Sequence, residues 1–274
     1  MVMNAIRWLV FVVAALVMNF PVIATIVTAL KTPADVISNA SLIPRAITLD
    51  NFAAVFTVSD RLNIWSYLAN SLSASLIGTI LPILLCLPLA FAIARRDYGR
   101  DLLLPLVVNL RAMPLIIFAI PLYMMYQTLG LLDTRFGLGL ILAVVNLPLA
   151  LVLLINAVAE IPRELDEAAG MDGARTGRIL SRLTLPLIRP AIATTFVFGF
   201  ITAWNEFLFG LMLTTSKAVP MTVGASFFFS AGGGGVQWGV AAAVIVVASA
   251  PPVILGLIMY RQIGRSMLAG AVKG

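Results

Sequence analysis

SLSASLIGTILPILLCLPLAFAIA, residues 71–94, contains no charged residue and is long enough to cross a lipid bilayer as an α-helix, since a crossing takes about 20 apolar residues. The rest of the chain has the same character. Of its 274 residues, 61% are hydrophobic and 11% are charged, and the mean hydropathy is +1.05. Water-soluble domains are nearer half apolar and a quarter charged. The composition therefore predicts an all-α membrane protein whose solvent is lipid.

Five further apolar runs are long enough to cross a membrane. The six predicted transmembrane helices cover residues 8–30, 71–94, 102–126, 138–158, 190–213 and 240–260. Prolines interrupt several of them, which is tolerated because neighbouring helices satisfy the freed carbonyls. The first run is longer than the apolar region of a signal peptide and is predicted to be retained. We find no internal repeat and no soluble part, so residues 1–274 are predicted to form a single transmembrane domain.

The basic residues predict the orientation of these helices. With the N-terminus inside, the inner side holds twelve of the 18 Lys and Arg residues and the outer side holds five, while Arg111 lies within a span. The positive-inside rule then places both termini in the cytoplasm. Loop 159–189 is predicted to be cytoplasmic and loop 214–239 to lie outside. In another outer loop, Thr48 is expected to cap a short helix.

Several classes of function are excluded by what the chain lacks. It has no histidine and a single cysteine, Cys86, so it can form no disulfide within the chain, no Cys/His metal site and no histidine-dependent catalytic site. It contains no G-x-x-x-x-G-K-[ST] motif and therefore no P-loop for ATP. The net charge of +6 reports orientation and contact with membrane lipid rather than nucleic acid binding. Energy for any transport must come from a partner chain or from an ion gradient.

A charged segment interrupts this apolar chain in loop 159–189: EAAGMDGARTGRILSRLTLP, residues 167–186. Pro162 suits the first position of a helix, and the acids after it stabilise the positive end of that helix. Gly170 and Gly173 are expected to break the run, because glycine takes the positive φ that a sharp turn needs. The loop is thus predicted to contain two short helices joined by a glycine turn.

The second helix is predicted to start near Ala174 and to carry Arg175, Arg178 and Arg182 on one face. The residues alone leave two interpretations open. The helices form an amphipathic hairpin on the inner leaflet, with arginines toward anionic lipid, or they dock against another protein. The acidic, small surface of the first helix argues against lipid, whose headgroups would repel it.

The spacing resembles the signature of ABC-importer permeases: Glu-Ala-Ala, three residues, Gly, nine residues, then Ile-x-Leu-Pro. The matching residues are Glu167-Ala168-Ala169, Gly173 and Leu183-Thr184-Leu185-Pro186, with Leu183 in place of isoleucine. The surroundings are similar to the maltose-type carbohydrate uptake family over nearly the whole chain. The six-span length and the ending are similar to the shorter of its two permeases. The stretches that carry this likeness are Asn70-Ser71-Leu72, Ala92-Ile93-Ala94-Arg95, Arg111-Ala112-Met113-Pro114, Ile120-Pro121-Leu122-Tyr123, Gly130-Leu131-Leu132-Asp133-Thr134, Trp204-Asn205-Glu206-Phe207 and residues 269–274.

The resemblance implies a type I ABC importer transmembrane domain in the bacterial inner membrane, a multi-pass protein. Its implied partners are a second permease in a heterodimer, two copies of an ATPase subunit and an extracytoplasmic solute-binding protein. ATP and Mg would be bound by the ATPase subunits, so this chain is expected to bind no cofactor or metal and not to be an enzyme. Its implied cargo is a sugar, a short oligosaccharide or a relative such as a polyol, a glycoside or an anionic sugar derivative.

The resemblance also assigns roles to residues. The first helix of loop 159–189 would enter a cleft of the ATPase and carry its motion to the membrane, with Glu167 in charge contacts. The residues implied in this coupling are Glu164, Asp166, Glu167, Ala168, Ala169, Gly170, Met171, Asp172, Gly173 and Arg175. The tail residues Ala271, Val272, Lys273 and Gly274 would reach between the ATPase subunits, whereas without the resemblance they are a frayed terminus.

Two further stretches carry open alternatives. Glu206, which follows Trp204 and Asn205, is an acid inside the fifth span. Three interpretations are open: it lines the translocation path, it forms a buried polar bond between helices, or it lies near the outer interface. The outer loop contains Gly232, Gly233, Gly234 and Gly235, which form either a flexible linker or, by resemblance, a scoop that dislodges sugar from the binding protein. Arg111 is expected to snorkel to the headgroups.

A rival function is an ion-coupled secondary transporter with Glu206 as proton carrier. Six spans without a visible repeat count against it, and ATPase co-purification distinguishes the two.

Overall fold

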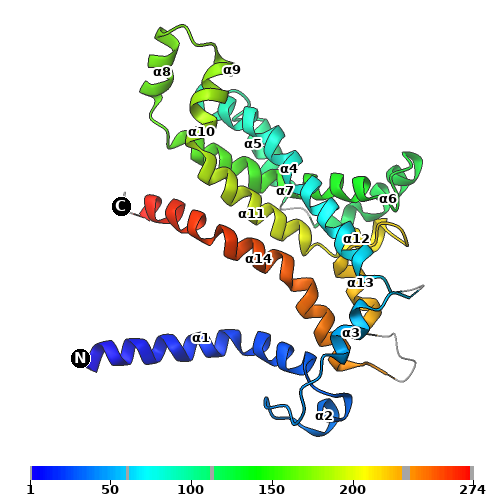
Figure 1. Cartoon of the computed structure of the whole chain (residues 1–274). Helices are drawn as coiled ribbons and strands as arrows, with labels where there is room; N and C mark the ends of the chain where they lie inside the picture. Colours follow the sequence, from blue (N-terminus) through cyan, green and yellow to red (C-terminus); the bar gives the residue numbers. More distant parts are fainter. Residues whose placement is uncertain (1, 60–61, 112–113, 230–234, 272–274) are drawn as a thin grey trace. The chain divides into compact units, whose positions relative to one another are not determined.

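The computed structural model describes residues 2–59, 62–111, 114–229 and 235–271. Over these residues the regular structure is helical, apart from one isolated antiparallel bridge between Lys31 and Ile47. The prediction of an all-α protein is confirmed. The chain divides into two compact units, whose helices are labelled in Figure 1. Unit 1 comprises Met1–Trp65 and Val223–Ala250, and unit 2 comprises Ser66–Thr222 and Pro251–Gly274.

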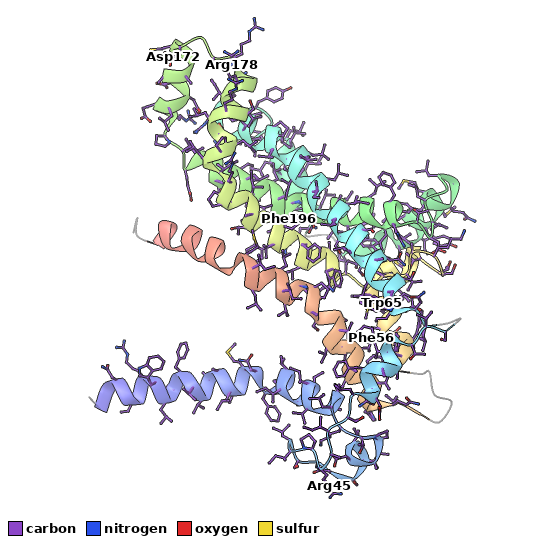
Figure 2. All side chains as sticks on the ribbon, in the orientation of Figure 1. Arg45, Phe56, Trp65, Asp172, Arg178 and Phe196 are labelled. Atoms are coloured by element: carbon purple, nitrogen blue, oxygen red, sulfur yellow. The ribbon has the colours of Figure 1, made fainter. Side chains whose placement is uncertain are left out.

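The first three helices lie in unit 1. They are α1, Val2–Ala29; α2, Pro33–Ser38; and α3, Asp50–Phe56. Helix α1 covers nearly all of the first predicted span. The N-cap residue of α3 is Leu49 rather than the predicted Thr48, although the hydroxyl of Thr48 accepts the backbone N–H of Asp50 at 3.1 Å. The rings of Phe56 and Trp65 pack with centroids 5.3 Å apart (Figure 2).

A buried asparagine joins α3 to the end of α1. The side-chain amide of Asn51 donates hydrogen bonds to the carbonyls of Ala29, at 2.9 Å, and Lys31, at 2.8 Å. Asn51 is buried, and a Cβ atom at Gly239 would come within 2.6 Å of its side chain. The glycine therefore leaves the space that this polar contact occupies.

Helices α4 to α14 follow α3. Their bounds are α4, Ile64–Arg96; α5, Leu103–Asn109; η1, Leu115–Phe118; α6, Ala119–Thr128; α7, Arg135–Ala159; α8, Arg163–Met171; α9, Thr176–Ile179; η2, Leu180–Thr184; α10, Leu185–Leu187; α11, Arg189–Trp204; α12, Leu208–Leu213; α13, Met221–Phe228; and α14, Trp238–Ala271. Among the described residues, four helices are long and apolar enough to cross a membrane: Ile6–Ala29, Ile64–Arg96, Arg135–Ala159 and Trp238–Met259. A fifth counts if the bent pair Thr176–Leu187 and Arg189–Trp204, at 74°, is one crossing.

Two of the predicted spans, each expected as one run, are divided. Span 102–126 consists of α5, η1 and α6, and η1 begins directly after Pro114. Proline has no N–H with which to continue a preceding helix, which favours a break there. Span 190–213 consists of α11 and α12, and α12 begins where the carboxylate of Glu206 accepts its first N–H groups. Such a cap stabilises a new helix start.

The centre of unit 2 is a junction of α4, α7 and α11. The amide of Asn146 on α7 donates to the carbonyl of Gly78 on α4 and to that of Gly199 on α11, both at 2.9 Å. A Cβ atom on Gly78 would lie 2.6 Å from Cβ of Leu142, and one on Gly139 would lie 2.7 Å from Ile77. Small residues thus allow α4 and α7 the close approach that packs helices in membranes.

Enlarging this contact should destabilise unit 2. Gly78→Leu forces side-chain atoms into Leu142 and its backbone, an overpacking that costs about 1–3 kcal/mol. We expect a lower midpoint of thermal unfolding in detergent, followed by fluorescence-detected size exclusion. Gly256→Leu is the matched control, because no atom lies within 4 Å of a Cβ there. Equal midpoints for the two variants would contradict the close packing of α4 and α7.

Candidate functional site

The charged loop 159–189 folds as two short helices with a glycine turn between them, as predicted. Helix α8 has Pro162 at its N-cap position and acids in its first turn. The turn is closed by hydrogen bonds from Gly173 N to Gly170 O, at 3.0 Å, and from Ala174 N to Ala169 O, at 2.9 Å. Gly173 has a φ of +79°, which a residue with a side chain rarely adopts.

One detail of the prediction is wrong. Gly170 does not break the first helix but lies inside α8, since the helix runs on to Met171. A glycine with helical neighbours on both sides is tolerated at a cost of about 1 kcal/mol relative to alanine. The second helix, α9, begins at Thr176, close to the predicted start near Ala174.

Most of α8 is exposed, and it projects from one end of unit 2 together with α9 (Figure 1). Glu164 and Glu167 are exposed, and Met171 at the end of the helix is 85% exposed. Figure 2 shows Asp172 and Arg178 at the two sides of the turn. The other residues predicted for coupling are exposed as well, except Asp166 and Ala169, which are half-buried. The exposed surface of the helix therefore consists of acids, small residues, Arg163, Leu165 and Met171.

The acid predicted within the fifth span, Glu206, lies in the break between α11 and α12. Its carboxylate accepts the N–H groups of Leu208 and Phe209, both at 2.9 Å, and that of Gly210 at 3.4 Å. Its carbonyl accepts the hydroxyl of Thr222 at 2.9 Å. The described contacts give Glu206 a structural role as the cap of α12, a role that the alternatives drawn from the sequence did not include.

The two residues before Glu206 differ in burial. Trp204 is 3% exposed and stacks on Phe200, with ring centroids 5.6 Å apart. Asn205 is exposed, and its amide donates to the carbonyl of Ile201 at 2.9 Å. Trp204 is therefore part of the packed core of unit 2, whereas Asn205 has an accessible surface.

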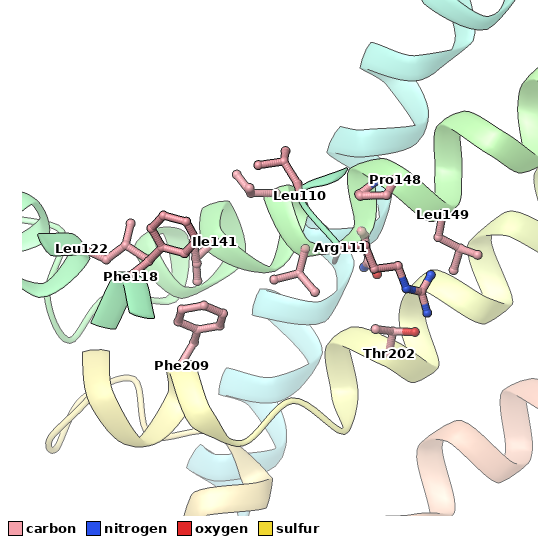
Figure 3. Close-up of a pocket in the computed structure, with 12 residues that line it drawn as sticks. Leu110, Arg111, Phe118, Leu122, Ile141, Pro148, Leu149, Thr202 and Phe209 are labelled. Atoms are coloured by element: carbon pink, nitrogen blue, oxygen red, sulfur yellow. The ribbon is translucent and has the colours of Figure 1, made fainter. Parts of the chain in front are cut away.

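A cavity of about 350 Å³ lies beside this break in unit 2, and the sequence did not reveal it (Figure 3). Its wall is mostly apolar, with Arg111, Asn146 and Thr202 as polar members. Figure 3 shows the guanidinium of Arg111 directed toward Thr202 on α11. Within the described residues, Asn146 Oδ1 is buried without a hydrogen-bond donor. Arg111, expected from the sequence to snorkel to the headgroups, thus forms part of a cavity wall. The sequence feature that could have indicated this is the position of Arg111 in an apolar run just before Pro114.

A second polar cluster that the sequence missed holds the segment 214–221. Asp133, with a φ of +54°, accepts the backbone N–H groups of Thr215, Ser216, Lys217 and Ala218 at 2.9–3.2 Å. Burial alone would raise the pKa of Asp133, but these donors outweigh it and hold the pKa well below its ordinary value. We call this arrangement the Asp133 clasp.

Two residues of α4 complete the clasp. The amide of Asn70 donates to the carbonyls of Lys217, at 3.0 Å, and Val219, at 2.9 Å, and its oxygen accepts Arg135 Nε at 2.6 Å. The hydroxyl of Ser71 accepts the N–H of Met221 at 2.7 Å. The start of α4 and the turn just before α7 therefore both hold this loop. The signal in the sequence was the presence of Asn70, Ser71 and Asp133 within the stretches that carry the family likeness.

The remaining predicted site residues are only partly described. Ala271 is the last residue of α14, whereas Val272, Lys273 and Gly274 lie outside the described residues. Gly232, Gly233 and Gly234 also lie outside them. Gly235 is described, is exposed and has a φ of +106°.

Removing the charge of Asp133 should loosen the clasp. Asp133→Asn loses a charge-assisted acceptor, and hydrogen bonds to charged groups contribute about 1.5–3 kcal/mol each. We expect a lower unfolding midpoint in detergent at neutral pH. Because the folded-state pKa is lowered, the stabilisation is complete above the ordinary pKa of about 4 and is lost as pH falls through the folded pKa. The difference in unfolding midpoint between wild type and Asp133→Asn should therefore shrink in acid.

The control is Asp101→Asn, at an exposed carboxylate, which should leave the unfolding midpoint unchanged. A difference between wild type and Asp133→Asn that does not depend on pH would contradict this account.

Comparisons with known proteins agree with this geometry. Residues 83–269 match the family described as binding-protein-dependent transport system inner membrane component. The trehalose transport system permease protein SugB of Mycobacterium tuberculosis (strain CDC 1551 / Oshkosh) is 33% identical over 244 residues, which cover 88% of each chain. The diacetylchitobiose uptake system permease protein DasC of Streptomyces coelicolor is 31% identical over 257 residues, covering 93% of this chain and 92% of that protein.

Solved structures show the same fold. A chain of a bacterial ABC transporter involved in the import of the acidic polysaccharide alginate superposes with a TM-score of 0.76, at 23% identity, over 95% of this chain and 96% of that one. A chain of the MetNI methionine ABC transporter in an inward-facing conformation gives a TM-score of 0.56, at 18% identity, over 74% and 93%. The fold is therefore that of a type I ABC importer transmembrane domain. With a matched region that covers most of its length, the chain belongs to the family of binding-protein-dependent transport system inner membrane components, the non-catalytic permeases of ABC importers.

Proposed function

We propose that this permease moves a carbohydrate or a related solute across the inner membrane and that α8 couples it to ATP hydrolysis on partner chains. The observation that carries the proposal is the exposed helix α8, closed by Gly173 at the spacing of the permease signature. A short helix held to the membrane domain at both ends is stiff enough to act as a lever. Its exposed acids can pair with basic residues at the rim of a cleft.

The cargo class rests on the names of several relatives. They include permeases for trehalose, for diacetylchitobiose, for alpha-glucosides and for sulfoquinovosyl glycerol. Each is at least 31% identical to this chain over most of its length. The shared chemistry is a sugar or a sugar derivative, so we assign that class to this permease.

The proposed assembly contains a second permease, two ATPase subunits and an extracytoplasmic solute-binding protein. A neighbour in fold was solved with an alginate pentasaccharide-bound periplasmic protein, which is the arrangement we propose here. ATP and Mg are bound by the ATPase subunits in this proposal. Residues 271–274 reach between those subunits, and Gly232 to Gly235 face the binding protein. Membership of this family argues for ATP rather than an ion gradient as the energy source.

The tip of α8 should be covered by the ATPase. The single cysteine, Cys86, is buried, so a Cys86→Ala background leaves no native thiol. In that background we introduce Met171→Cys, whose parent side chain is 85% exposed. A membrane-impermeant maleimide should label this cysteine readily in the isolated permease and slowly in the complex with the ATPase.

Tyr98→Cys is the matched control, since Tyr98 is 72% exposed but lies on the loop between α4 and α5. It should be labelled equally in both preparations. Two results would contradict the proposed role of α8. One is that the permease does not co-purify with an ATPase, and the other is that Met171→Cys is labelled equally with and without the ATPase.

The shape of the turn should matter to coupling. Gly173→Val places a β-branched residue at a φ of +79°, a strain of about 1–3 kcal/mol. We expect an inserted permease that has lost ATPase association or ATP-driven uptake in proteoliposomes. Gly177→Val is the control, because neither glycine has an atom within 4 Å of a Cβ and only Gly173 has a positive φ. Normal uptake by Gly173→Val would count against the lever.

A further inference from the structure

One acid of α8 is turned toward the permease itself. Asp166 Oδ2 lies 2.5 Å from Arg95 Nε, in the last turn of α4, and the two side chains are 15% and 7% exposed. Glu164 and Glu167, the neighbouring acids, are exposed. The acids of α8 therefore point in two directions. Glu164 and Glu167 are open to a partner, whereas Asp166 faces the permease itself.

Further hydrogen bonds tie the end of α4 to the segments on both sides of α8. Arg95 donates to the carbonyl of Ile161 at 2.9 Å, before α8 begins. Arg96 donates to the hydroxyl of Thr176 at 2.5 Å, after the turn. The end of α4 thus contacts the chain before, within and after the coupling helix.

The contact of Arg95 with Asp166 is selective for charge. Among the described residues, Arg95 Nε and both carboxylate oxygens of Asp166 are buried without an aligned hydrogen bond, so the attraction between opposite charges is what compensates their loss of water. Removing one partner leaves the other charge buried and unpaired. A neutral isostere therefore cannot replace either residue.

The covalent chain connects α8 to α7 and, through η2 and α10, to α11. It makes no such short connection to α4, whose end is followed by α5. At the junction of unit 2, Asn146 joins α4 to α7 and α11 by hydrogen bonds. Two direct contacts join α8 to α4: a long hydrogen bond from Arg163 to the carbonyl of Ala94, at 3.4 Å, which is exposed, and the ion pair, which is buried and shorter.

We propose that Arg95 and Asp166 are positioning residues that lock α8 to α4, so that movement of α8 by the ATPase displaces α4 together with α7 and α11. This inference rests on the proposed coupling role of α8 and assigns Asp166 to the permease side of it. In this proposal Glu167 contacts the ATPase, whereas Asp166 passes the movement of α8 on to α4. When the pair is lost, the ATPase still binds and hydrolyses ATP, but less of that hydrolysis drives transport.

The test uses the complete importer with its binding protein in proteoliposomes and measures cargo transported per ATP hydrolysed. Asp166→Asn and Arg95→Gln should each lower this ratio about fivefold or more, the size of a lost coupling between sites, with ATPase association retained. The charge exchange Arg95→Asp with Asp166→Arg should recover most of it. Glu160→Gln, at an exposed acid of the same loop that is not among the coupling residues, is the matched control and should leave the ratio unchanged.

A covalent cross-link between positions 95 and 166 distinguishes a loss of the link between α8 and α4 from a general loss of folding. In the Cys86→Ala background, Arg95→Cys with Asp166→Cys should be poorly coupled as free thiols and should regain coupling when a short bis-maleimide joins them. An unchanged ratio in Asp166→Asn, loss of ATPase association in that variant, or no recovery on both charge exchange and bridging would overturn the inference. Failure of the proposed function is a different result, because wild-type permease would then not bind an ATPase.

Discussion

The side chain of Asn146 is bonded to two other helices at once, and the arrangement of unit 2 depends on that junction. In lipid there is no hydrophobic force to press helices together, so close packing and polar bonds hold them instead. Its amide reaches the carbonyls of Gly78 and Gly199, and it can do so because those residues have no side chains in the way. The backbones of α4, α7 and α11 are thereby held at a fixed separation midway along the unit.

Polar contacts also hold short segments at the ends of these helices. At one end, Asp133 and Asn70 hold the segment 214–221. At the other, Arg95 and Asp166 hold the base of α8. The apolar centre of the unit therefore carries two charged attachments, and both of them use the ends of α4 or α7.

The sequence predicted those features that depend on local spacing. Continuous apolar runs predicted α1, α4, α7 and α14, and the order of proline, acids and glycine predicted α8 with its turn at Gly173. It did not predict the break at Glu206, because the same carboxylate suits a lipid-facing, pore-lining or capping position until its donors are known. The Arg95–Asp166 pair was beyond reach for another reason. Those residues are far apart in the chain and meet only because α4 and α7 pack closely, which no local pattern encodes.

The Asp133 clasp has a consequence for how this surface can change over time. Asp133 and Asn70 bind mainly backbone N–H and carbonyl groups of residues 215–219. Peptide groups are the same whatever side chains they carry, so the shape of the loop is largely independent of its own sequence. Thr215, Ser216 and Lys217 are exposed. The hydroxyls of Thr215 and Ser216 also donate to Asp133, whereas Lys217 enters these contacts through its backbone N–H and carbonyl. Position 217 can therefore change in charge and size while the path of the loop stays the same, so a permease built this way can alter its surface without a new fold.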